Sequence, residues 1–75
     1  MSAFRIEVYQ HRFADDVEDR GSDYEKPAAQ IRLMTDVEWE KAIDLTTSRI
    51  FEKGLVEEIR LTLEEVLDEE FGVSP

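Results

Sequence analysis

Residues 35–54 constrain the fold most, because they carry a helix start, a helical period and a helix end. Thr35 and Glu38 match a capping box, in which a hydroxyl and a carboxylate each bond a free backbone N–H at a helix start. Gly54 can adopt the left-handed conformation that ends a helix. The segment therefore predicts a helix over about Asp36–Lys53. Its core-facing stripe recurs at three- and four-residue spacing and comprises Trp39, Ala42, Ile43, Thr46 and Ile50.

Two runs in the first half of the chain alternate between apolar and polar residues, which is the period of a half-buried strand. They cover residues 3–13 and residues 28–34. The intervening residues 14–27 are rich in aspartate and contain one glycine and one proline, so they indicate a loop. Two such runs around one loop predict an antiparallel β-hairpin, which needs another element to cover its apolar face.

The C-terminal segment has two interpretations. Ile59, Leu61 and Leu63 alternate with polar residues, as in a short third strand. Read instead as a helix over residues 55–71, the segment places six apolar residues within one sector of about 120°, namely Leu55, Val56, Ile59, Leu63, Val66 and Leu67. We favour the helix, because the glutamate-rich composition suits it better than a strand. The predicted fold class is then α+β, a single domain of residues 1–75 with the order β-β-α-α.

On the helical interpretation, Leu61 lies opposite the apolar sector and is surrounded by carboxylates. An apolar residue ringed by charges is typical of an interface, where the charges steer the partner and the apolar group is desolvated on contact. The candidate partner-binding residues are Glu57, Glu58, Leu61, Glu64, Glu65, Asp68 and Glu69. Two alternatives remain open: a face that is merely solvated, since single exposed leucines are common, or a core position for Leu61 if the segment is a strand.

The chain is strongly acidic, with 19 acidic and 9 basic residues and a formal net charge of −10. Residues 1–34 hold seven acids and five bases, whereas residues 35–75 hold twelve and four, so the excess lies in the C-terminal half. Such a charge opposes contact with DNA, RNA or an anionic membrane and favours a basic protein surface. We expect a basic protein partner and no direct binding to nucleic acid or membrane.

Residue types that support catalysis or metal binding are scarce. The chain has no cysteine and a single histidine, His11, which cannot build a zinc site by the usual ligand sets. An EF-hand alignment of the aspartate-rich segment places Arg20 and Pro27 at ligand positions, so that motif fails. No glycine-rich phosphate loop is present. We expect neither an enzyme nor a cofactor nor a metal site.

The sequence also lacks a signal-peptide pattern and any apolar run long enough to cross a membrane, which favours a cytoplasmic protein. Two function classes follow. The first is a non-enzymatic inhibitor or nucleic-acid mimic that binds the basic surface of a nucleic-acid-handling protein. In size and composition the chain is similar to phage-encoded anti-restriction and anti-CRISPR proteins, which act in the host cytoplasm.

The second class is a structural or regulatory subunit, either a homo-oligomer or an antitoxin-like partner. Such a subunit docks through apolar helix faces and uses its acid only for solubility. Salt separates the two classes, because screening weakens contacts between exposed charges and hardly affects an apolar contact.

Overall fold

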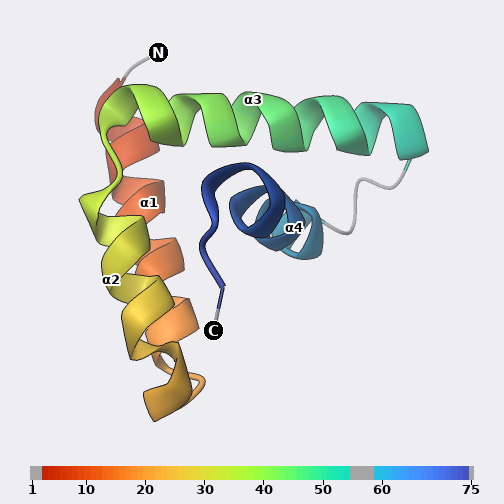
Figure 1. The fold of residues 1–75 in the computed structure, drawn as a ribbon. Helices are drawn as coiled ribbons and strands as arrows, with labels where there is room; N and C mark the ends of the chain where they lie inside the picture. The colour runs from red at the N-terminus through yellow and green to blue at the C-terminus, as the bar shows by residue number, and fades with distance from the viewer. Residues whose placement is uncertain (1–2, 55–58, 75) are drawn as a thin grey trace.

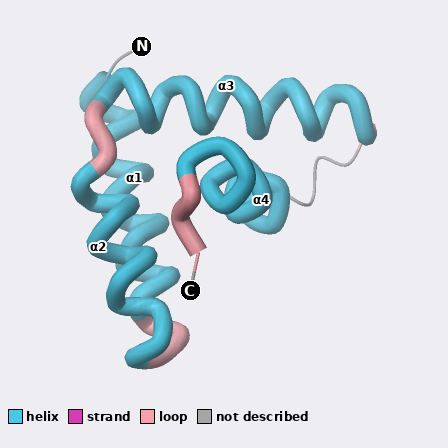
Figure 2. The backbone as a smooth tube through the Cα atoms, in the orientation of Figure 1, coloured by secondary structure: helices cyan, strands magenta, loops and turns pink. Residues whose placement is uncertain are grey.

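A computed structural model of the protein describes residues 3–54 and 59–74. Within these residues the chain forms four α-helices and one short 3-10 helix, and no strand. In chain order the elements are α1 (Ala3–Glu18), η1 (Ser22–Tyr24), α2 (Glu25–Leu33), α3 (Asp36–Lys53) and α4 (Ile59–Phe71). Short turns connect α1 to α2 and α2 to α3 (Figure 2).

The helices form an angled arrangement. The antiparallel pair α1 and α2 lies side by side, and α3 runs across one end of this pair (Figure 1). α4 lies in the angle between the pair and α3, and the chain end that follows α4 turns back beside it (Figure 1). The backbone of α4 packs closely against α3 but not against α1 or α2, with which it shares the hydrophobic core through its side chains.

The predicted β-hairpin is wrong, and the described chain is all-α instead of α+β. Residues 3–13 lie in α1 and residues 28–34 fall in α2 and the turn after it, while residues 14–27 hold the end of α1, the connecting turn and the start of α2. The buried residues show why the helix is preferred. In α1 they follow the helical period, at Gln10, Phe13, Ala14 and Val17.

The predictions for the capped helix are confirmed. α3 spans Asp36–Lys53, and the Thr35 hydroxyl accepts a hydrogen bond of 3.1 Å from the Glu38 backbone N–H. The Glu38 carboxylate accepts the reciprocal bond from the Thr35 N–H, at 2.9 Å. Gly54 has a φ of 67° and its N–H donates to the Ile50 carbonyl at 2.8 Å, which is a left-handed helix cap.

The helical interpretation of the C-terminal segment is also confirmed from Ile59 to Phe71, while residues 55–58 lie outside the described part of the chain. Gly72 ends α4 in the left-handed conformation, with a φ of 68°, and its N–H donates to the Asp68 carbonyl at 3.2 Å. The chain then reverses and buries Val73. No helix in the described ranges is long and apolar enough to span a membrane.

The core fills the space between the helices. Trp39 of α3 is fully buried, as predicted, and its ring centroid lies 6.1 Å from the ring centroids of both Tyr9 and Phe13. This aromatic contact joins α3 to α1. α2 adds Ala28 and Ile31, and α4 contributes a buried set that comprises Thr62, Leu63, Val66 and Leu67. The core thus fixes which face of α4 points inward and which remains available.

Candidate partner-binding site

The outward face of α4 carries an apolar residue among carboxylates. Leu61 is 58% exposed, which confirms the expected exposure, and Asp68 is also exposed. The two residues are seven positions apart, about two turns along the same side of the helix. Together with Glu64 and Glu65 they form what we call the α4 ridge, opposite the buried side chains of this helix. The predicted site residues Glu57 and Glu58 lie outside the described residues.

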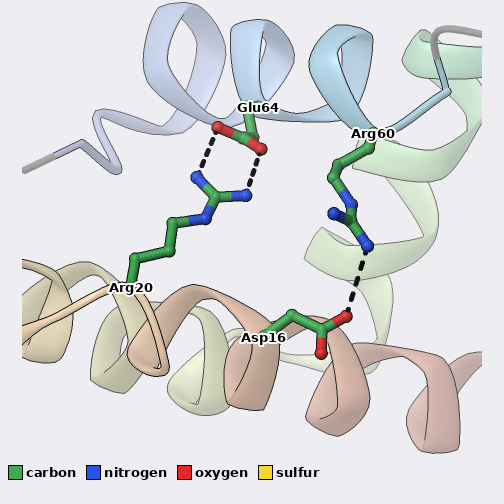
Figure 3. Close-up of polar contacts among 4 residues, drawn as sticks. All are labelled: Asp16, Arg20, Arg60 and Glu64. Atoms are coloured by element: carbon green, nitrogen blue, oxygen red, sulfur yellow. Dashed lines mark hydrogen bonds and ion pairs between the residues drawn. The ribbon is translucent and has the colours of Figure 1, made fainter.

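One flank of the α4 ridge is tied to α1 by two ion pairs (Figure 3). The Arg20 guanidinium, just beyond α1, donates two hydrogen bonds to the Glu64 carboxylate, at 2.9 and 2.7 Å. Arg60 of α4 lies 3.7 Å from the Asp16 carboxylate of α1, so the second pair has the opposite polarity. The hydrogen bonds that Arg20 donates to Glu64 raise the pKa of Arg20 above its ordinary value, although partial burial opposes this effect. Arg20 therefore stays charged.

The other flank of α4 faces α3, where one arginine lies close to three carboxylates. Arg49 lies 2.9 Å from Glu69, 3.5 Å from Glu70 and 3.7 Å from Glu65, measured between guanidinium nitrogens and carboxylate oxygens. A single positive charge cannot neutralise three negative ones, so this flank stays acidic. Over Ile59–Phe71 as a whole, five acidic residues and one basic residue give a net charge of −4.

These contacts refine the predicted site. Glu64, Glu65 and Glu69 each lie within ion-pair distance of an arginine of this chain, so their carboxylates already interact within the protein. Asp68 has no basic side chain within ion-pair distance among the described residues. The structure therefore places Leu61 and Asp68 at the centre of the surface. The sequence interpretation missed Arg20, Arg49 and Arg60, since their positions beside α4 arise only from the packing of the helices.

The Arg20–Glu64 pair should contribute little to stability, because both side chains are about one-third exposed and exposed pairs contribute only about 0.2–1 kcal/mol. We expect a double-mutant cycle of Arg20→Gln and Glu64→Gln to give a coupling energy of that size in urea unfolding. The coupling should decrease further at high salt. A coupling above about 2 kcal/mol would show that the pair is a fixed brace and not an exchangeable contact.

A groove lies between the α4 ridge and the α1–α2 pair, with a volume of about 430 Å³. Its apolar lining comes from α1, η1, α2, α4 and the chain end, and includes Val17, Tyr24, Ile31, Leu67 and Val73. Its charged lining consists of Arg20, Glu64, Glu65 and Asp68, and Leu61 also borders it. The Arg20 guanidinium carbon lies 5.7 Å from the centre of the Tyr24 ring, a cation–π contact. The α4 ridge and this groove thus form one continuous surface.

Sequence reasoning placed half of the groove-lining residues in the predicted strands or the predicted loop, so it could not find the groove. His11 is exposed on α1. In the part of the chain that the structure describes, no three histidine, aspartate or glutamate side chains are placed to hold a metal ion. No protein-family model, curated protein or solved structure matches this chain.

Proposed function

We propose that this protein is a non-enzymatic binding protein whose α4 ridge contacts a basic surface of another protein. The exposed Leu61 between carboxylates carries the proposal. Full burial of a leucine contributes about 1.5–3 kcal/mol, whereas each exposed ion pair contributes about 0–1 kcal/mol. The leucine therefore supplies affinity on contact, and the carboxylates supply attraction and orientation before it.

The partner is a protein that handles nucleic acid, since such proteins present the basic surfaces that a chain of net charge −10 attracts. Occupation of that surface excludes the nucleic acid, so the protein acts as an inhibitor. Glu64 and Asp68 are one helical turn apart, about 6 Å along the axis, which approaches the spacing of two nucleotides on one DNA strand, about 6.8 Å. Mimicry of a phosphate row is thus compatible with the ridge. The proposal places the protein in the cytoplasm with its target.

A second candidate function is a docking subunit that uses apolar surface. It is favoured by three large apolar side chains that are more than three-quarters exposed, namely Leu33 at 81%, Val37 at 78% and Phe51 at 87%. Single exposed apolar residues are common in proteins, whereas the α4 ridge combines an apolar residue with complementary charge. The two functions differ in their salt dependence, because an apolar dock hardly responds to ionic screening.

The test measures binding kinetics of a partner retained by the immobilised chain from a lysate of the cells that encode it, and then purified. Leu61→Ala should speed dissociation about tenfold, which corresponds to about 1.4 kcal/mol, with little change in association. Asp68→Asn should instead slow association and weaken its dependence on salt. Glu40→Gln, an equal charge change at an exposed position of α3, is the matched control. Unchanged kinetics in both ridge variants would refute the proposal.

A further inference from the structure

The groove beside the α4 ridge has a buried apolar floor and an open mouth, where Leu61 is 58% exposed and Tyr24 is half-buried. Val17 and Ile31 are 4% and 2% exposed at its base, and Leu67 and Val73 of the C-terminal segment are buried on its other side. The α4 backbone does not pack against α1 or α2, and the Arg20–Glu64 and Asp16–Arg60 pairs bridge the space between them (Figure 3). The Arg20–Glu64 pair thus lies at the rim of a groove with an apolar wall on each side.

The charge around this groove selects its occupant. Three carboxylates and one guanidinium line it, a net charge of −2, and the guanidinium already makes two hydrogen bonds to Glu64. A bound cation would therefore meet Asp68 without opposition from Arg20. A second copy of this chain would bring its own charge of −10 against the same surface. An uncharged apolar molecule would place no positive charge against the Asp68 carboxylate.

We propose that the groove binds a basic amphipathic helix of the partner protein, with apolar side chains between its walls and a lysine or arginine side chain against Asp68. This inference rests on the proposed function and assigns the part of the partner that is recognised. Helical walls favour a helical occupant, because the ridges of one helix fit the grooves between others. Leu61 borders both the ridge and the groove, so one helix can cover the two together.

The test uses two synthetic peptides of about 14 residues, long enough for a helix with anchors at i, i+3, i+4 and i+7. The first carries leucine at the anchor positions and lysine on the other face. The second replaces each leucine with serine and keeps the charge. Both are titrated into the ¹⁵N-labelled full chain, with amide chemical shifts as the readout. The leucine peptide should bind at least about tenfold more tightly and shift the amides of Val17, Tyr24 and Val73.

A blocking experiment uses the absence of cysteine from the chain. The Tyr24→Cys variant is treated either with N-phenylmaleimide, which fills the groove, or with iodoacetamide, which adds a small neutral group. Only the bulky label should abolish the difference between the two peptides. The Ser48→Cys variant, at an exposed position of α3, is the control and should bind normally with either label. If the Tyr24→Cys variant does not fold, the comparison of the two peptides on the unmodified chain still tests the groove proposal.

Equal affinity of the two peptides, no binding of either, or shifts centred on Leu33, Val37 or Phe51 would overturn the groove proposal. Where the peptides bind, Asp68→Asn separates the groove proposal from the function proposed above; where neither binds, the kinetics of the purified partner decide the proposed function. If this variant weakens both peptides more than the Glu40→Gln control does, the α4 ridge remains a surface for basic partners and only the groove proposal fails. If it weakens neither peptide relative to that control, both proposals fail.

Discussion

Replacing Trp39 with alanine should lower the free energy of unfolding by about 3–5 kcal/mol. The side chain is fully buried and joins α3 to α1 through ring contacts with Tyr9 and Phe13. A chain of this length has a total stability of roughly 4–11 kcal/mol, at about 0.05–0.15 kcal/mol per residue. The variant should therefore lose a large part of its stability, which urea unfolding followed by far-UV circular dichroism would measure.

Two further substitutions make this result specific. Trp39→Phe should cost clearly less, because it keeps an aromatic ring and removes an indole N–H that is buried without an acceptor among the described residues. Phe51→Ala, at a side chain that is 87% exposed on the same helix, should change stability by less than about 0.5 kcal/mol. A loss below about 1 kcal/mol for Trp39→Ala would contradict the burial of this side chain.

Trp39 belongs to the part of the fold that the sequence predicts well. The signals for α3 are local: a capping box at Thr35 and Glu38, a stripe of regular spacing, and a glycine at the end. Each acts within a few residues of the chain, so no tertiary information is needed to recognise it. The exposure of Leu61 could be predicted for the same reason, since it follows from the helical period of α4 and the position of the buried residues.

The strand prediction for the first half of the chain was wrong because two residues there have a burial opposite to that expected from their polarity. Gln10 is only 3% exposed although it is polar, and Leu33 is 81% exposed although it is apolar. The polar side chain of Gln10 hides the helical spacing of the buried residues of α1, and treating Leu33 as inward creates an apparent alternation with Ile31 in α2. Polarity alone then favours strands. The correct burial requires knowledge of what Gln10 contacts in the folded chain.

The groove could not be predicted for a related reason. Arg20 and Glu64 are 44 residues apart in the sequence, and their contact depends on where α4 lies beside α1. Sequence patterns identify the face of one helix, but they do not say which surface another helix places next to it. The acidic character of α4 is thus evident from the sequence, whereas the arginines that form ion pairs with Glu64 and Glu69 are not.

Gln10 itself supports the last prediction. Its side-chain amide donates to the Ile31 carbonyl at 2.7 Å and to the Met34 carbonyl at 3.0 Å, and so satisfies two acceptors at the end of α2. Gln10→Leu keeps most of the volume but leaves both carbonyls without this donor. The Ile31 carbonyl keeps its bond from the Met34 N–H at 3.2 Å, so we expect a cost of about 1 kcal/mol in urea unfolding, the net contribution of a typical hydrogen bond.

Gln10→Glu should cost more at neutral pH, because a carboxylate in this position would be buried facing two carbonyl oxygens and cannot donate to either. Burial and these oxygens both raise the pKa of the introduced carboxyl in the folded state above its unfolded value of about 4.3. As the pH rises, the unfolded chain releases this proton at a lower pH than the folded chain does. The loss of stability caused by ionisation is therefore full above the folded-state pKa and disappears below about pH 4.3. Unfolding measured at pH 7 and pH 4, relative to the unsubstituted chain, should therefore show the Gln10→Glu variant recovering at low pH, whereas the deficit of Gln10→Leu should stay constant. An equal deficit of Gln10→Glu at both pH values would mean that this side chain reaches solvent and does not cap α2.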